Sequence, residues 1–237
     1  MSEILTYENW DDERAAAILG DHPDYLDVLK WAFREYGDSI VYACSFGAEG
    51  IVLIDLIHKV HRQAKIIFLD TGLHFPETYA LIEDIKGRFP SLDIRMAVPK
   101  ASVAEQAKWY GEELWKENPN LCCHLRKVVP LQEALGDAKA WISGLRREQS
   151  VTRRHVQYVN QDHKFRKIKI CPLINWSWNE IMTYLHLNNL PYNPLHDKGY
   201  PSIGCAPCTR AVTAAEDPRA GRWAGRQKTE CGLHENQ

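Results

Sequence analysis

The amino-acid sequence predicts an α/β fold: a mostly parallel, twisted sheet with helices on both faces, followed by a tail rich in Cys, Arg and Gly. Three observations support this prediction. Short apolar runs suited to buried strands alternate with amphipathic helical patterns. Several of the apolar runs end in polar turns that contain glycine or serine. From about residue 191 the composition changes to Gly, Pro, Arg and Cys with few apolar residues, which favours loops and short helical turns.

The elements follow from the spacing of apolar residues. Short apolar runs predict strands at 39–45, 64–69, 92–98, 138–143 and 165–170. Apolar residues at helical spacing predict helices over 24–36, 76–89, 102–116 and 177–189, and one through Leu53, Leu56, Ile57 and Val60. The chain therefore divides into a helical segment at 1–37, an α/β domain at 38–190 and a C-terminal segment at 191–237.

Length and composition limit the functions that the chain can have. Its 237 residues suit one α/β domain with an appended tail, and 45% apolar and 25% charged residues are typical of a soluble globular protein. A formal net charge of -2 argues against bulk attraction to nucleic acid or to a membrane. Because no segment approaches the ~20 apolar residues of a membrane span and Met1–Trp10 does not resemble a signal peptide, we expect a cytoplasmic protein. The sequence leaves homo-oligomer formation open.

Three polar turns follow predicted strands at 45–50, 70–74 and 144–150. The first, Ser45-Phe-Gly-Ala-Glu-Gly50, leads into a helix, the arrangement in which backbone N–H groups and the helix dipole hold a phosphate. An ordinary strand-to-helix turn is the alternative, because a short glycine motif is a weak signal. All three turns lie at the carboxyl end of a parallel sheet, where ligands of such folds bind, so we expect them to converge on one ligand.

The seven cysteines indicate metal or redox chemistry more than a disulfide framework. Cys205-Ala-Pro-Cys208 and the adjacent Cys122-Cys123 provide four thiolates that could hold zinc or an iron-sulfur cluster. Adjacent cysteines suit a tetrahedral zinc site poorly, so a cluster is favoured over zinc, with inert core cysteines as a third interpretation. Cys44 and Cys171 lie in apolar strand contexts, which favours buried, inert thiols.

The last cysteine has a different setting. Cys231 lies in Lys228-Thr-Glu-Cys-Gly-Leu-His234, a polar tail with almost nothing apolar to bury. Its thiol is therefore free to react or to bind metal.

These stretches together resemble the assimilatory adenylyl-sulfate (APS) and phosphoadenylyl-sulfate (PAPS) reductases, a family with the adenine-nucleotide α-hydrolase-like fold. The resemblance covers roughly residues 38–234, and the joint occurrence of its last three segments is highly specific. The matching segments are 45–49, 69–78, 122–127, 142–150, 190–197, 202–209 and 228–234.

The resemblance implies a role for individual residues. Cys231 is the expected nucleophile, Lys127 is the expected cation beside a 4Fe-4S cluster, and residues 191–237 form a cluster-ligand loop with a mobile catalytic tail. The expected cluster ligands are Cys122, Cys123, Cys205 and Cys208. The expected substrate-binding residues of the nucleotide-binding domain and the tail are Ser45, Phe46, Gly47, Ala48, Glu49, Leu69, Asp70, Thr71, Gly72, Gly144, Arg146, Arg219 and Arg222. For each lysine and arginine, a solvated surface charge is the alternative.

The implied reaction is attack of the Cys231 thiolate on the sulfate sulfur of APS, which releases AMP and leaves an S-sulfonated cysteine. Thioredoxin or a similar dithiol then releases sulfite. Members of this family that carry both cysteine pairs use APS, and some also accept PAPS; we therefore expect APS as the substrate and leave PAPS open.

Two other functions compete with this prediction. An ATP-dependent tRNA thiolation enzyme of the same fold would show Ser-Gly-Gly-x-Asp-Ser where this chain has Ser45-Phe-Gly-Ala-Glu-Gly50, and nucleic-acid binding would favour a basic domain. A non-catalytic, metal-stabilised nucleotide-binding module would leave Cys231 without a role.

Overall fold

The computed structural model describes residues 3–20 and 23–234. Its centre is a six-stranded sheet in the order β3-β2-β1-β4-β6-β5, in which every neighbouring pair is parallel except β5 and β6. The strands are β1 (Ile40–Cys44), β2 (Lys65–Leu69), β3 (Asp93–Ala97), β4 (Ala140–Ile142), β5 (Val159–Asp162) and β6 (Lys167–Ile170). The predicted fold class, a mostly parallel sheet between helices, is therefore confirmed.

The strand order reverses next to β1. The chain proceeds outward from β1 through β2 to β3, and β4 then pairs with the opposite edge of β1, with Tyr42 beside Ile142. The carboxyl ends of β1 and β4 thus lie side by side at the switch point, where open α/β sheets bind their ligands. The turns that begin at Ser45 and Ser143 meet there.

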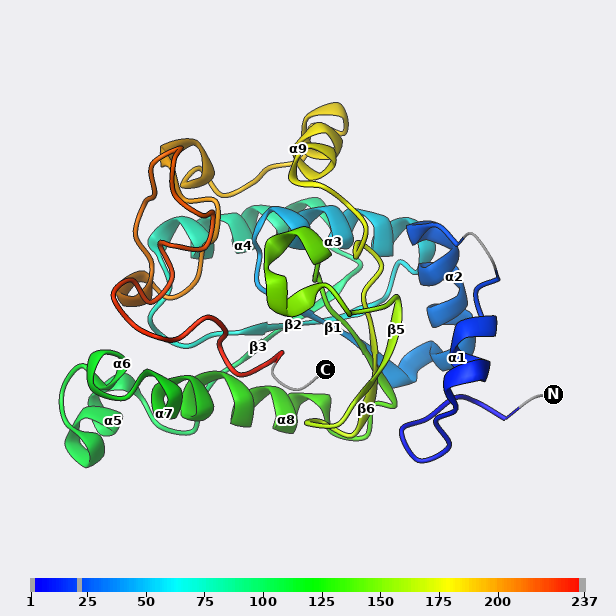
Figure 1. The fold of residues 1–237 in the computed structure, drawn as a ribbon, viewed down its shortest axis with the longest axis horizontal. Helices are drawn as coiled ribbons and strands as arrows, with labels where there is room; N and C mark the ends of the chain where they lie inside the picture. Colours follow the sequence, from blue (N-terminus) through cyan, green and yellow to red (C-terminus); the bar gives the residue numbers. More distant parts are fainter. Residues whose placement is uncertain (1–2, 21–22, 235–237) are drawn as a thin grey trace.

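Helices cover both faces of the sheet (Figure 1). Above it in that view lie α3 (Ala48–Val60), α4 (Pro76–Arg88) and α9 (Trp178–Leu187), and α2 (Tyr25–Tyr36) and α1 (Asp12–Ala17) lie at one end. Below it runs the helical stretch formed by α7 (Pro119–Cys123), the π-helical turn η2 (His124–Val128) and α8 (Val129–Leu135). Alternate strand residues pack on opposite sides: Tyr42 joins the upper core, and Val41 joins the lower core against α8.

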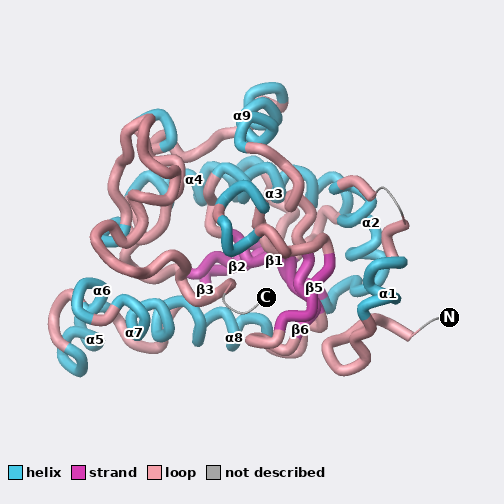
Figure 2. The backbone as a smooth tube through the Cα atoms, in the orientation of Figure 1, coloured by secondary structure: helices cyan, strands magenta, loops and turns pink. Residues whose placement is uncertain are grey.

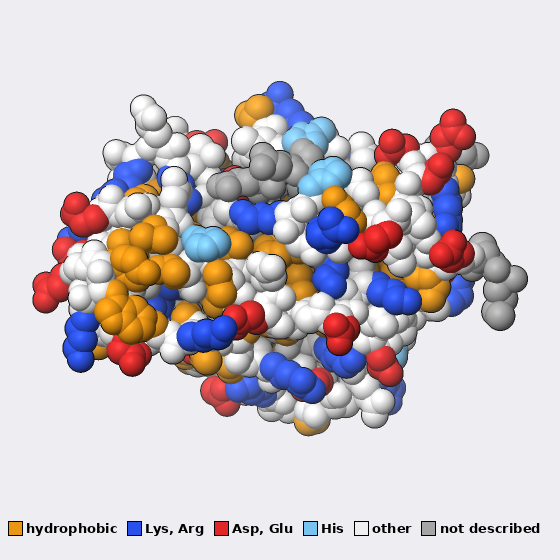
Figure 3. Space-filling view, turned by 90° about the horizontal axis from the view of Figure 1, so that it is seen from below, with side chains coloured by type: hydrophobic (Ala, Val, Ile, Leu, Met, Phe, Trp, Pro, Cys, Tyr) orange, Lys and Arg blue, Asp and Glu red, His pale blue; other side chains and the backbone are white. Residues whose placement is uncertain are grey.

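The structure differs from the prediction at two places, a helix that is broken and a strand that was not predicted. The predicted helix over 102–116 is broken into α5 (Val103–Tyr110) and α6 (Leu114–Glu117), because Gly111 has φ 86° and Glu113 has φ 52°. The strand β5 was not predicted, because its Val-Asn-Gln-Asp sequence carries no apolar run and pairs only as an antiparallel edge. The broken helix leaves Trp109 and Tyr110 exposed, and Figure 3 shows hydrophobic side chains gathered at that end of the lower face.

The C-terminal segment is mostly loop (Figure 2). After α9 the described chain contains only short 3-10 turns, η5 (His196–Lys198) and η6 (Ala206–Cys208). The segment passes beside the carboxyl ends of β1 and β2 and returns between the sheet and the lower helices. Single bridges tie it to the domain at His74–Cys205 and to itself at Thr209–Arg222. No helix within 3–20 or 23–234 has the length and apolar content needed to cross a membrane.

Candidate active site

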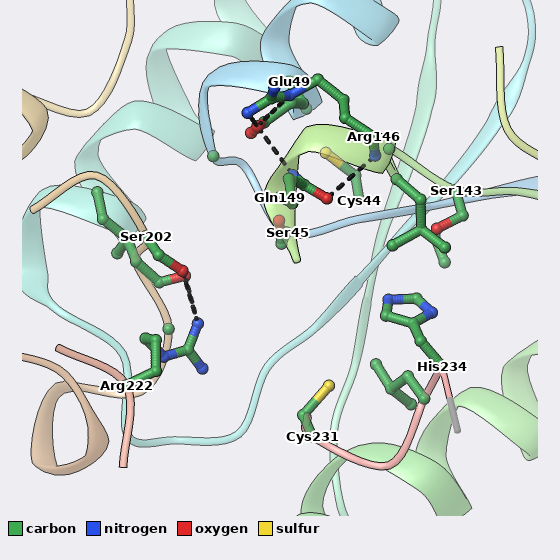
Figure 4. Close-up of a pocket in the computed structure, with 18 of the residues that line it drawn as sticks. Cys44, Ser45, Glu49, Ser143, Arg146, Gln149, Ser202, Arg222, Cys231 and His234 are labelled. Carbon is green, nitrogen blue, oxygen red and sulfur yellow. Dashed lines mark hydrogen bonds and ion pairs between the residues drawn. The ribbon is translucent and has the colours of Figure 1, made fainter. Parts of the chain in front are cut away.

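A cavity of about 380 Å³ opens at the carboxyl ends of β1 and β4, a size suited to a small-molecule ligand. Ser45 and Gly47 line it from the turn after β1, and Gly144 lines it from the turn after β4. Arg222 and Cys231 line it from the C-terminal segment (Figure 4). His74 lines it from the turn after β2, so residues of all three predicted turns and of the tail share one cavity.

The turn after β1 presents backbone to the cavity. Gly47 is the N-cap of α3, and no side chain within 3–20 or 23–234 caps the helix, so its first N–H groups are available to a ligand. The side chains of Phe46 and Ala48 are buried in the core, so at these two positions only the backbone can reach a substrate. A Cβ at Gly50 would lie 3.0 Å from Cys44 Sγ, so a larger residue here would crowd the buried thiol.

The turn after β4 is held by an ion-pair network. The Arg146 guanidinium lies 2.8 Å from Glu49 Oε1 and 2.6 Å from Glu148 Oε2, and its side chain is only 5% exposed. Gln149 Nε2 donates to the same Glu49 oxygen at 2.9 Å. Arg146 and Glu49 were both predicted to bind substrate; in the structure they bind each other across the switch point (Figure 4).

The turn after β2 faces a second, smaller cavity. Leu69 and His74 line the large cavity at either end of this turn, whereas Thr71 lines the small one. Asp70 accepts hydrogen bonds from the Tyr79 hydroxyl at 2.6 Å and from the N–H of Gly72 at 2.9 Å. Of the four substrate-binding residues predicted here, Leu69 lines the large cavity, and Asp70, Thr71 and Gly72 lie beside it.

The four paired cysteines line that smaller cavity together. Cys122 and Cys123 come from the end of α7, Cys205 is the N-cap of η6, and Cys208 is the last residue of η6. The Thr71 hydroxyl lies 3.3 Å from Cys205 Sγ. Among the described residues, no group of three or more His, Cys, Asp or Glu side chains has an arrangement ready to hold a metal ion. Two thiol pairs from distant parts of the sequence nevertheless converge on one enclosed space, as a cluster would require.

The π-helical turn η2 begins directly after Cys123 and carries two buried cations. Such turns are frequent at functional sites, because the extra residue redirects neighbouring side chains. Arg126 donates to the carbonyl oxygen of Thr71 at 2.6 Å and to Gln106 Oε1 at 3.1 Å. Lys127 lines both cavities.

Lys127 and the neighbouring thiols change each other's pKa. Burial disfavours its charged form, but Cys205, Cys231 and Cys123 raise the pKa of Lys127 above 10.5. In turn, although burial acts the other way, Lys127 and the Thr71 hydroxyl lower the pKa of Cys205 below 9.0. Cys44 and Cys171 behave as predicted for inert core thiols: burial raises their pKa to about 12 and about 11.

The tail arginines line the large cavity with Cys231. Arg222 lies across the cavity from the turn residues, with weak hydrogen bonds to Ser202 Oγ at 3.4 Å and the carbonyl oxygen of Ile203 at 3.3 Å. Its Nε finds no partner in the part of the chain that the structure describes. Arg219 donates to Glu230 Oε2 at 3.3 Å. Arg222 therefore has donors left for a ligand, whereas Arg219 is already engaged.

The sequence model of the phosphoadenosine phosphosulfate reductase domain family matches residues 39–211. The chain belongs to this family. It is 61% identical over 235 residues to adenosine 5'-phosphosulfate reductase 2 of Bacillus subtilis, covering 99% of this chain and 100% of that protein. The adenosine 5'-phosphosulfate reductase of Geobacillus kaustophilus is 60% identical over 233 residues, 98% of this chain and 99% of that one.

Solved structures agree with the family assignment. The phosphoadenylyl-sulfate reductase of Candida auris superposes with a TM-score of 0.71 at 32% identity, over 85% of this chain and 95% of that one. The FMN adenylyltransferase of Candida glabrata superposes with a TM-score of 0.59 at 16% identity, over 82% of this chain and 69% of that one, which shows a shared fold only.

Four residues of this reductase-family site were not singled out from the sequence. Arg153, Glu230 and His234 line the large cavity, and the buried Lys169 of β6 contacts His234. Glu230 and His234 lie inside the motif around Cys231 without an assigned role. The Lys-Ile-Lys-Ile sequence of β6 carried the one usable signal, a lysine between apolar residues of a buried strand.

The burial of Lys169 predicts a pH-dependent stability. Burial lowers the pKa of Lys169 from 10.5 to about 8, with Arg153 acting in the same direction and Cys171 and Asp162 opposing it. Above pH 8 the unfolded chain still holds a proton that the folded chain has released, so this residue makes the free energy of unfolding rise with pH. Between about pH 7 and about pH 10, wild type should gain about 2 kcal/mol relative to Lys169→Met.

Urea unfolding of both proteins at a series of pH values, under reducing conditions, measures this difference. Groups that do not interact with Lys169 contribute equally in both proteins and cancel in the comparison. A difference that stays constant with pH would contradict the lowered pKa of Lys169.

Proposed function

We propose that the protein is an adenylyl-sulfate reductase that forms sulfite and AMP by way of an S-sulfonate on Cys231. One observation carries this proposal: Cys231 lines the same cavity as the uncapped start of α3, with Lys127 and Arg222 on its walls. A nucleotide phosphate held by the turn would thus bring the attached sulfate within the space that Cys231 faces. Relatives about 60% identical are named adenosine 5'-phosphosulfate reductases.

The first step is a nucleophilic displacement at sulfur. The Cys231 thiolate attacks the sulfate sulfur, and a new S–S bond forms while the bond from sulfur to the bridging oxygen breaks. The oxygen leaves with the bonding electrons as part of the AMP phosphate. Negative charge is high in this step, because a thiolate approaches a sulfate that is joined to a phosphate.

Cations around the cavity offset this charge. The pKa of Lys127 is raised by the neighbouring thiols despite its burial, so its ammonium remains charged at neutral pH. Arg222 has a free Nε and lines the cavity with Lys127. Preorganised donors in a desolvated site stabilise developing charge more than they would in water. We assign Lys127 and Arg222 to the sulfate and the leaving phosphate.

The second step returns the enzyme to its thiol form. A dithiol reductant such as thioredoxin attacks Cys231 Sγ, the S–S bond breaks, and sulfite leaves with the bonding electrons. The second thiol of the reductant then attacks the mixed disulfide and releases the Cys231 thiolate. Two electrons pass from the dithiol to sulfur, which requires no other redox partner and suits the reducing cytoplasm where we place the protein.

A 4Fe-4S cluster is part of the proposal. Cys122, Cys123, Cys205 and Cys208 would hold it, since all four line one cavity. When bound, the cluster would supply a fixed charge distribution beside the substrate space. Lys127 lies between this cavity and Cys231, so it connects the two. Residues 38–190 would bind the nucleotide, residues 191–237 would bring the ligand loop and nucleophile, and residues 1–37 would form a separate helical segment.

Sulfite production from APS and from PAPS, each with thioredoxin, tests the function. We expect kcat/KM to be at least about tenfold higher for APS. Arg146, which lines the cavity from the β4 turn, is already paired with Glu49 and Glu148, so it is not free to bind an added 3'-phosphate. Equal values for both nucleotides would make the enzyme a dual reductase, and activity on PAPS alone would refute the proposed substrate.

A further inference from the structure

The tail around Cys231 is held at alternate residues, on both sides of the nucleophile. Glu230 binds Arg153, the carbonyl oxygen of Gly232 accepts from Lys164 Nζ, and His234 binds Lys169. The three cations come from one part of the domain, between the 3-10 turn η4 (Val151–Arg153) and β6. We call these contacts the tail latch: Glu230–Arg153, Gly232–Lys164 and His234–Lys169.

The contact on the N-terminal side of Cys231 is a buried, two-point ion pair. Arg153 Nε donates to Glu230 Oε1 at 3.0 Å, and Arg153 Nη2 donates to Glu230 Oε2 at 2.8 Å. Both side chains are less than a tenth exposed. Burial acts against the carboxylate, but Arg153 and Arg219 lower the pKa of Glu230 below 4.5. A buried ion pair of this kind is favourable only when both side chains are in contact, because either charge alone would be buried without a partner. It therefore favours one position of the tail.

On the C-terminal side of Cys231, the imidazole ring of His234 is held by two residues, Lys169 and Trp141. Lys169 is fully buried, and its Nζ lies 2.9 Å from His234 Nδ1. The His234 ring stacks on Trp141 with centroids 6.1 Å apart and 8° between the planes, and Lys169 Nζ lies 4.7 Å from the same indole. A charged ammonium can only donate, so Nδ1 accepts and the ring is neutral with its proton on Nε2.

We propose that Arg153 and Lys169 are positioning residues that hold the tail by Glu230 and His234 and so set the place of Cys231 in the cavity. Each of these two residues binds a residue close to Cys231, and the Cys231 side chain still lines the large cavity. Two anchors that bracket one residue limit both its position and its direction. This inference rests on the proposed function for its catalytic consequence, but the docking of the tail can be measured without any turnover.

The first measurement is the rate of Cys231 alkylation by iodoacetamide without substrate, located by mass spectrometry. We expect Arg153→Ala and Lys169→Ala to raise this rate about tenfold, because the tail leaves its site more often. Arg154→Ala and Lys167→Ala are matched controls: Arg154 is an exposed neighbour, and Lys167 lies on the same strand but donates to Gly136. Both controls should alkylate as wild type does.

The second measurement is the single-turnover rate of S-sulfonation at saturating APS. We expect each latch variant to lose about 100-fold, because a misplacement near 1 Å costs that much in a displacement reaction. Affinity for AMP should fall much less than the S-sulfonation rate, since neither residue belongs to the β1 turn that we propose to hold the phosphate. The losses of Arg153→Ala and Glu230→Ala, and those of Lys169→Ala and His234→Ala, should combine to clearly less than their sum in each double variant, because the two residues of each pair share one contact.

The possible outcomes test the tail latch and the proposed function separately. Additive losses in both double variants, or unchanged Cys231 alkylation in Arg153→Ala and Lys169→Ala, would overturn the latch. Wild-type protein that forms no sulfite from APS would refute the proposed function, and the alkylation rates would then still decide whether the latch exists.

Discussion

Cys231→Ser should lose sulfite formation from APS by about 10⁴-fold or more, while affinity for AMP stays as in wild type. Removing the nucleophile of a covalent mechanism abolishes the main route, because a serine hydroxyl is not ionised at neutral pH. The tail should remain docked, since Glu230 and His234 still reach Arg153 and Lys169. The turn after β1, which we propose to hold the AMP phosphate, is not touched by the substitution.

The variant is compared with wild type by sulfite release with thioredoxin and by the mass of the tail peptide after incubation with APS alone. Wild type should gain one sulfonate on the peptide that contains Cys231, and Cys231→Ser should gain none. Cys171→Ala is the matched control, because Cys171 is a fully buried core thiol away from both cavities. A sulfonate found on Cys44 or Cys208 would move the nucleophile and contradict the mechanism.

The second large effect is expected from Cys205→Ser, which should lose bound iron, brown colour and at least about 100-fold in turnover. The Cys205 thiolate is favoured by Lys127 and by the Thr71 hydroxyl, and a serine oxygen is a poor ligand for an iron-sulfur cluster. Without the cluster, the segment around η6 would also lose its tie to α7. Activity should therefore fall together with stability.

Iron and acid-labile sulfide content, visible absorption and thermal unfolding of anaerobically purified protein measure this effect. Cys171→Ala should keep its iron, which separates the loss of a ligand from the loss of any buried thiol. A colourless, zinc-loaded wild type with full activity would contradict the cluster, and an active Cys205→Ser with normal iron content would remove Cys205 from the ligand set.

Local pattern was enough for most of the fold. The apolar run of β1, the start signals of α2 and the capping box of α9 each depend on residues close in sequence, and all three elements formed where expected. Chain order also predicted that the polar turns would share one edge of a parallel sheet. Local pattern failed where a single backbone conformation decided the outcome, as at Gly111, or where an edge strand carried polar residues, as in β5.

The sequence predicted which motifs form the candidate site, but not which of their side chains contact each other. Sequence alone determined that a glycine turn precedes a helix, that two cysteine pairs exist and that Cys231 stands apart in a polar tail. Only the tertiary structure decided that Arg146 is paired with Glu49, that Lys127 lies between two cavities, and that Glu230 and His234 are bound on either side of Cys231. The reason is physical: whether a charge is free or paired depends on partners that lie tens of residues away, and folding alone brings them within hydrogen-bond distance.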